Sequence, residues 1–219
     1  MNRRFSSHLF WGSHSPLSTL GAAVLIIMAS SRFALAIICA GALIWVYGLT
    51  SLIFSSARAI MPKRGRMLIL LFLSTFLCGI FMLLLSLLNP LLGMGAGLFL
   101  LLIPPCFLGS GFFDASESVD PMAIFFRAFF EALVIAGIIL ALALIREPLG
   151  LGTLSLPGGN QGIVELFNFG GEGNFVPFRI LSVSSGGLLL LGYGTALYRN
   201  IRDQSGNTPR HNDQEGKQS

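Results

Sequence analysis

The residues best placed to do chemistry in this chain are a cysteine and two acid–base pairs set in apolar sequence. Cys106 directly follows Pro104 and Pro105 inside an apolar run. These prolines lack backbone N–H groups, so they break a helix and free carbonyls in the preceding turn. A broken helix is tolerated at membrane depth only where protein or a cavity covers it. Cys106 is therefore predicted to face the interior of a helix bundle, where its sulfur is a candidate metal ligand.

Arg127 and Glu131 lie four residues apart, which places them on one face of a helix where they can pair. We interpret them as a self-neutralising pair near the membrane interface. Arg146 and Glu147 come directly before Pro148, which is expected to end the same helix. Arg146 is expected to reach back to the interface or to interact with the C-terminus of its own helix.

The chain has three cysteines, and Cys39 and Cys78 also lie in apolar runs. An odd number of buried thiols argues against a disulfide framework. The simplest interpretation of each one is a small apolar core residue. The histidines are confined to the terminal regions, and the sequence shows no Ser-His-Asp grouping and no phosphate-binding loop.

The composition identifies the elements that must position these residues. Hydrophobic residues make up 53% of the chain and charged residues only 11%, whereas about 25% charge is usual in a soluble domain. The chain is therefore predicted to be an integral membrane protein embedded in the lipid bilayer. The net charge of +4 does not indicate nucleic-acid binding, because the basic residues gather in one loop and the two tails, as topology signals do.

A spanning helix needs about 20 apolar residues, and the hydropathy pattern predicts an all-α fold of six membrane segments. The first is short enough to be a half-membrane or broken helix, and the fourth contains the two prolines. The segments form a domain over 15–199, between an N-terminal tail (1–14) that is retained and a disordered C-terminal tail (200–219). Their predicted bounds are 17–29, 33–55, 67–88, 91–113, 122–145 and 176–198.

Lysine and arginine predict the orientation. The two tails and the loop with Arg58, Lys63, Arg64 and Arg66 share one side, which should be cytoplasmic. The acidic loop with Asp114, Glu117 and Asp120 also falls there, since acids weigh little in this rule. Arg32 and the long loop 148–175 fall on the other side.

A faint repeat divides the six segments into three plus three. Ser15-Pro16-Leu17 opens the first segment and Asn89-Pro90-Leu91 opens the fourth. Two halves with three spans each would be inverted relative to one another, with broken helices meeting near the midplane. Ordinary helix N-terminal signals also explain these prolines. The Gly-rich stretches are interpreted as sites of close helix packing, at Gly93, Gly95, Gly97, Gly186 and Gly187.

Three stretches resemble the Rnf/Nqr family of six-helix membrane subunits, of the RnfA/RnfE and NqrD/NqrE type. The best match is Ile145-Arg146-Glu147 followed by Leu149-Gly150 and Gly152-Thr153-Leu154. The stretches 103–109 and 185–188 resemble two further family motifs, and the resemblance runs from about 15 to 199. The long loop after Gly152 looks more like the RnfE/NqrD branch.

This resemblance implies a non-catalytic or electron-relay subunit of an ion-translocating electron-transport complex in the bacterial inner membrane. It implies a homologous partner subunit, and a [2Fe-2S] cluster shared at the midplane by cysteines of the first and fourth helices. Cys106 matches the fourth-helix position. Leu25 occupies the first-helix position, so the resemblance implies a cluster that is incomplete or lost.

Two other functions remain open from the residues. The chain could be a small inverted-repeat transporter or channel without redox chemistry, in which the broken helices line a substrate path. It could also be a membrane assembly subunit with no site of its own.

Overall fold

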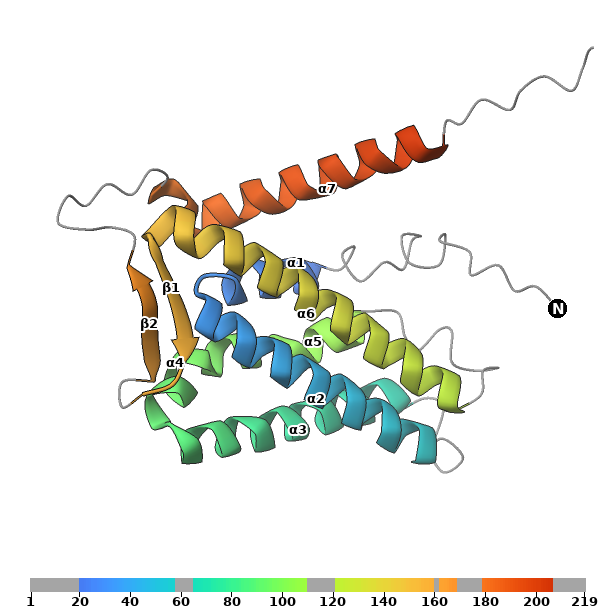
Figure 1. Ribbon diagram of the computed structural model, residues 1–219. Coiled ribbons are helices and arrows are strands. Elements are labelled where there is room, and N and C mark those ends of the chain that lie inside the picture. Colours follow the sequence, from blue (N-terminus) through green and yellow to red (C-terminus); the bar gives the residue numbers. More distant parts are fainter. Residues whose placement is uncertain (1–19, 58–64, 110–120, 160–161, 169–178, 207–219) are drawn as a thin grey trace, which may run out of the picture.

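The computed structural model describes residues 20–57, 65–109, 121–159, 162–168 and 179–206, and in these ranges the chain is mostly helical (Figure 1). The helices surround one apolar core, and a small hairpin closes one end of the bundle. The elements in chain order are α1 (Leu20–Ala29), α2 (Phe33–Ala57), α3 (Arg66–Leu88), α4 (Pro90–Leu100), α5 (Ile103–Gly109), α6 (Pro121–Leu151), β1 (Thr153–Pro157), β2 (Ile163–Asn168), the 3-10 helix η4 (Arg179–Ser182) and α7 (Ser184–Gly206).

Four of the described helices are long and apolar enough to cross a membrane, which indicates a membrane-embedded protein. They correspond to the second to fifth predicted segments. The described part of α1 has only 10 residues. The last helix, α7, begins at Ser184 rather than at 176, and it continues into the predicted tail as far as Gly206. The four candidate spans are Phe33–Ala57, Arg66–Leu88, Pro90–Gly109 and Met122–Leu151.

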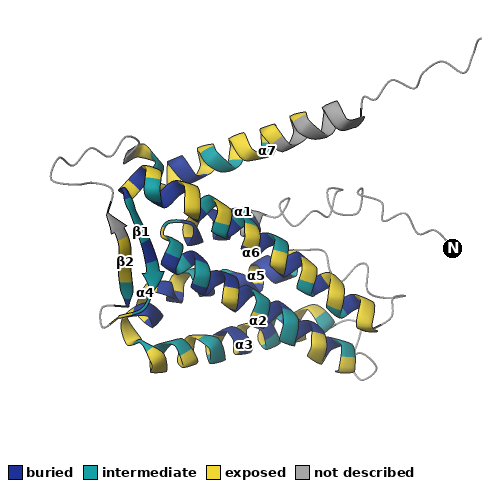
Figure 2. Ribbon diagram, in the orientation of Figure 1, coloured by how far each residue is buried: buried dark blue, intermediate teal, exposed yellow. Residues whose placement is uncertain are grey.

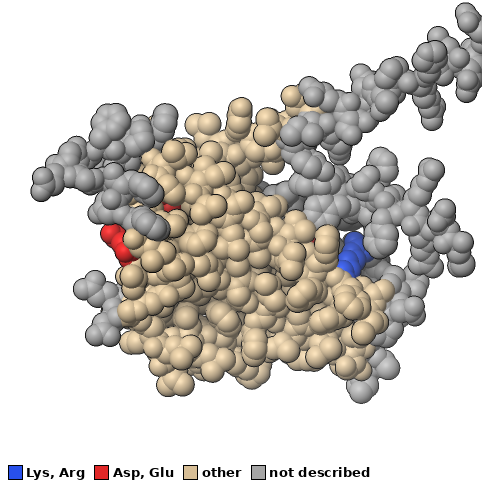
Figure 3. Space-filling model, viewed as in Figure 1, with Lys and Arg blue, Asp and Glu red and all other residues tan. Residues whose placement is uncertain are grey.

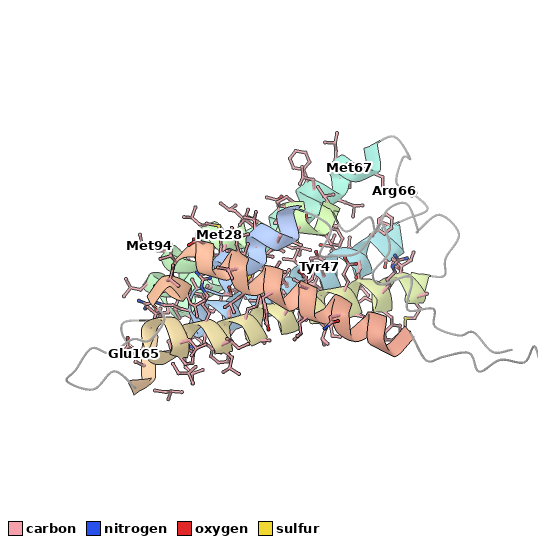
Figure 4. All side chains as sticks on the ribbon, turned by 90° about the horizontal axis from the view of Figure 1, so that it is seen from above. Met28, Tyr47, Arg66, Met67, Met94 and Glu165 are labelled. Carbon is pink, nitrogen blue, oxygen red and sulfur yellow. The ribbon has the colours of Figure 1, made fainter. Side chains whose placement is uncertain are left out.

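The long helices run between two distinct ends of the bundle (Figure 1). We call one the hairpin end; it holds β1, β2, the start of α2 and the last turns of α6. The far end holds the end of α2 and the starts of α3 and α6. Glu165 lies at the hairpin end and Arg66 at the far end (Figure 4). The face seen in Figure 3 carries almost no charge between these ends.

Antiparallel helices α2 and α6 form the most extensive helix pair and the centre of the core. On the outside, α3 and α4 present large apolar side chains, such as Phe72, Phe76 and Met94, which are 75%, 66% and 81% exposed (Figure 2). An apolar surface of this kind suits lipid. Helix α7 diverges from the bundle, and most of its described side chains are exposed (Figure 1, Figure 2).

The predicted break in the fourth segment is present between α4 and α5. Pro104 has no N–H to donate to the carbonyl of Leu100, four residues earlier. The Cys78 thiol of α3 donates to that carbonyl instead, with a sulfur–oxygen distance of 3.0 Å. A neighbouring helix therefore satisfies a carbonyl that the proline left free, as burial in lipid requires.

Helix α6 does not end at Pro148, as the sequence suggested. It continues for another turn to Leu151, with the proline inside the helix. Gly152 then adopts a left-handed backbone (φ 69°), and its N–H donates to the carbonyl of Pro148 at 3.1 Å. The glycine ends the helix, because a left-handed residue directs the chain away from the helix axis.

The segment after α6, expected to be loop, contains an antiparallel hairpin, so the fold is not purely helical. Strands β1 and β2 pair from Thr153↔Asn168 to Pro157↔Ile163, with an irregularity between Leu154 and Ser155. Gly159 and Gly162, both at positive φ, lie in the connection between the strands. The Ser155 hydroxyl accepts from the N–H of Ala34 at 3.4 Å, which joins the hairpin to the first turn of α2.

Two of the three glycines predicted to pack closely in α4 do so against α3. A side chain at Gly93 would collide with Ser86, and a Cβ at Gly97 would lie 2.9 Å from Met82. Gly95 has open space around it.

Several predicted features lie outside the described residues. They are the N-terminal tail 1–14, the start of the first segment with Ser15-Pro16-Leu17, the basic residues Arg58, Lys63 and Arg64, residues 110–113, the loop with Asp114, Glu117 and Asp120, part of the long loop at 169–175, the start of the sixth segment at 176–178, and the end of the tail at 207–219.

Candidate functional site

Cys106 faces the core, as predicted from its place after the two prolines. It lies on α5 with only 1% of its surface exposed. The phenolic hydroxyl of Tyr47, on α2, donates to its sulfur at 3.5 Å. The ring of Phe107 packs edge-on against the ring of Tyr47, with centroids 4.8 Å apart. A tyrosine and an aromatic neighbour thus hold the thiol in a dry environment.

The other two cysteines belong to the same core, and all three thiols are free. Cys39 lies on α2 and is 2% exposed. Even so, the described residues contain no group of three or more His, Cys, Asp or Glu side chains that could hold a metal ion.

The thiol of Cys78 has a structural role that can be measured. Cys78→Ala should lower the free energy of unfolding by about 1 kcal/mol more than Cys39→Ala, because only the first substitution leaves the Leu100 carbonyl without a partner. Both side chains are buried, so the loss of packing is matched. Equal destabilisation in detergent-based unfolding experiments would show that the thiol–carbonyl bond contributes nothing.

Leu25, which takes the family's other ligand position, is fully buried on α1 and belongs to the same core cluster as Cys106. Helices α1 and α5 pack against each other. A [2Fe-2S] cluster is usually held by four thiolates. The resemblance assigns two ligand positions to this chain. Cys106 supplies a thiol at one of them, and Leu25 stands at the other. The residues present do not fit a cluster held by two thiolates from each subunit.

Glu131 lies inside the helix packing. Only 8% of its surface is exposed, whereas Arg127, one turn earlier on α6, is exposed. The arginine attracts the carboxylate electrostatically. Yet Glu131 Oε1 is buried with no hydrogen-bond partner. The interpretation as a simple pair near the interface therefore does not account for this carboxylate.

Tyr47 and Thr50 are polar residues that the sequence reasoning did not single out. They stand three residues apart on α2 and both are buried. Tyr47 and Cys106 lie in the electrostatic neighbourhood of Glu131. Thr50 Oγ1 is buried without a hydrogen-bond partner. The signal in the sequence was available, because a tyrosine and a threonine at i, i+3 are polar residues in a mostly apolar helix.

Arg146 and Glu147 hold the hairpin end together by separate contacts. Arg146 is 2% exposed, so it does not reach out to the interface. Its Nη1 donates to the carbonyl of Ile27 at 2.8 Å and to the hydroxyl of Ser30 at 3.2 Å. Its Nε and Nη2 donate to carbonyls of η4, at 2.7 Å and 3.1 Å. The arginine therefore serves the end of α1 and the 3-10 turn, and not the C-terminus of its own helix.

Glu147 caps the start of α2. Its Oε2 accepts from the N–H of Phe33 at 2.6 Å, where the positive end of the helix dipole favours a carboxylate. Its Oε1 is buried and has no hydrogen-bond partner. Together with Ser155, this residue connects α6 and β1 to the first turn of α2.

The described chain thus contains two polar regions within apolar surroundings. One is the capping network around Arg146 and Glu147 at the hairpin end. The other lies between α2, α5 and α6 and contains Tyr47, Cys106 and Glu131. Compared with known proteins, the chain matches no protein-family model and no curated protein sequence.

Proposed function

We propose that this chain is a membrane subunit of an Rnf/Nqr-type ion-translocating electron-transport complex, in which it acts as a scaffold beside a homologous subunit. One observation carries the proposal. The short α1 packs against the broken segment α4–α5, so that the first and fourth segments meet in the core with Leu25 and Cys106 among its members. An inverted repeat with broken first and fourth helices would have this arrangement.

The proposed topology has six membrane segments, with α1 as a half-membrane first segment and α7 as the sixth. The alternating course of the helices between the hairpin end and the far end supports it (Figure 1). The basic residue Arg66 at the far end supports placing that end, with both termini, on the cytoplasmic side of a bacterial inner membrane.

The proposed role is structural, because only one of the two ligand positions that the resemblance assigns to this chain holds a thiol. A partner subunit could contribute further ligands, but Leu25 cannot ligate iron. The chain would then shape the membrane part of the complex while other subunits transfer the electrons.

The test is to purify the complex from native membranes through a tag on this chain, and to measure its subunits, iron content and EPR spectrum. A homologous membrane subunit should co-purify. Cys106→Ser should leave iron and electron transfer unchanged, as should Cys39→Ser, the control at a buried thiol outside the motif. Isolation of the chain without any partner would contradict the scaffold role. Iron lost in Cys106→Ser but not in Cys39→Ser would show that Cys106 is a ligand.

A small inverted-repeat transporter or channel is the second candidate, and the partnerless polar atoms of Glu131 and Thr50 favour it. Such atoms inside a membrane bundle commonly mark an ion or substrate path. Ion or solute flux by the purified chain alone in liposomes would support this function. Obligate co-purification with a homologous subunit, together with no flux, would exclude it.

A further inference from the structure

Helices α2 and α6 each carry a buried polar side chain with an oxygen that has no hydrogen-bond partner. Glu131 is 8% exposed and Thr50 is 0% exposed. Glu131 Oε1 and Thr50 Oγ1 are both buried and have no hydrogen-bond partner. A buried hydroxyl or carboxylate oxygen without a partner costs free energy, and a charged one costs more. Glu147 Oε1 of α6 is also without a partner, but that carboxylate already accepts from the N–H of Phe33 through its Oε2. Glu131 and Thr50 are the two residues that still need an explanation.

Helix geometry places the two residues at the same depth. Glu147 of α6 contacts the N–H of Phe33 at the start of α2, which fixes the register of this antiparallel pair. At about 1.5 Å per residue, Thr50 lies roughly 26 Å along α2 from that contact. Glu131 lies roughly 24 Å back along α6 on the same scale. Both residues are therefore at one level, well inside the apolar length of the helices.

The charged and titratable neighbours leave the carboxylate incompletely neutralised. From its own helix, Arg127 attracts Glu131, but the arginine side chain is exposed. From α2, Tyr47 lies in its electrostatic neighbourhood, and the tyrosine hydroxyl already donates to the sulfur of Cys106. From α5, the neighbouring group is the thiol of Cys106 itself. A carboxylate among these groups lacks a buried positive partner.

We propose that Glu131 and Thr50 form a binding site for a monovalent cation, either a proton or Na⁺, at the α2–α6 interface. A cation on the carboxylate removes its charge, and a hydroxyl oxygen is a suitable neutral ligand for Na⁺ or acceptor for a carboxylic acid proton. Arg127 lies one helical turn from Glu131, toward the far end of the bundle (Figure 1). The inference does not depend on the proposed scaffold role, since a cation site could serve a complex or a free-standing transporter.

The experiment uses the full-length protein in liposomes and an apolar carbodiimide, which modifies protonated carboxyl groups in apolar surroundings. Peptide mass spectrometry reads the labelling of Glu131 at several pH values, with Na⁺ or with K⁺ as the control ion. Labelling should become slower as the pH rises, because the reagent needs the protonated acid. If the site also takes Na⁺, this ion should slow labelling at constant pH, whereas K⁺ should do so less.

Thr50→Val and Ser51→Ala form a matched pair of variants. The Ser51 hydroxyl is also buried, but it donates to the Gly48 carbonyl of its own helix at 2.9 Å. Loss of one ligand or hydrogen bond worth about 1.4 kcal/mol changes affinity tenfold. Thr50→Val should therefore shift the pH midpoint by about one unit, or weaken Na⁺ protection about tenfold. Ser51→Ala should change neither.

Two results would overturn the cation site. The first is a labelling rate of Glu131 that responds to neither pH nor Na⁺, which would mark a carboxyl group that exchanges no cation. The second is a Glu131 that reacts only after denaturation. Both are independent of whether a homologous subunit co-purifies, so they can be distinguished from a failure of the scaffold proposal.

Discussion

Replacing Arg146 with alanine should lower the free energy of unfolding by about 3–5 kcal/mol, because several hydrogen bonds to a charged group, each worth roughly 1.5–3 kcal/mol, are lost together. The guanidinium is almost fully buried and donates to three carbonyls and one hydroxyl. Alanine would leave these carbonyls without their donors in a dry environment. The cost should appear as loosening of both the end of α1 and the η4 turn.

Arg146→Lys should recover only part of this stability. Lysine keeps the charge, but its single ammonium cannot reproduce the planar fork that reaches two elements at once. Arg127→Ala is the control, because Arg127 is an exposed arginine on the same helix. Unfolding in detergent, followed by circular dichroism, measures the three variants. An Arg146→Ala protein as stable as Arg127→Ala would refute the proposed role of the network.

The class of fold could be predicted because hydropathy is a local property of the sequence. Four of the six predicted segments coincide with the candidate spans within a few residues. The exceptions are the C-terminal ends of the fourth and fifth segments, which differ from the ends of the corresponding spans. The helix break at Pro104 and Pro105 followed from covalent structure alone. What the sequence did not reveal was the donor for the freed Leu100 carbonyl, since Cys78 is distant in the chain.

The hairpin was missed for a physical reason. Its strands are short, and their pairing depends on the two positive-φ glycines in the connection and on the contact between Ser155 and α2. The end of α6 was placed too early because a proline in the last turns removes one hydrogen bond without stopping the helix. Gly152, with its positive φ, was the stronger signal.

The candidate site was only half visible in the sequence. The burial of Cys106 could be expected, and its partner Tyr47 could not, because the contact joins residues 59 positions apart. The i, i+4 rule correctly paired Arg127 with Glu131 electrostatically. That rule says nothing about which side chain of a pair turns toward the core, and in this protein the acid is buried while the base is exposed.

Gly186→Ala should be strongly destabilising, by about 2–3 kcal/mol, which is at the upper end of the usual cost of overpacking. A Cβ at this position would lie 2.5 Å from both the carbonyl oxygen of Ile180 and the Cα of Leu181. These are backbone atoms of η4, which cannot move aside as a flexible side chain would. The same turn supplies carbonyls to Arg146, so a displaced η4 would also weaken that network.

Gly192→Ala is the matched control on the same helix. A Cβ at Gly192 meets nothing within 4 Å, and alanine is favoured over glycine in a helix by about 1 kcal/mol. This variant should therefore be as stable as the parent or slightly more stable, while Gly186→Ala unfolds earlier in the same detergent assay. Equal stability of the two variants would mean that the start of α7 is not packed against η4, and that Arg146 holds η4 without support from the last helix.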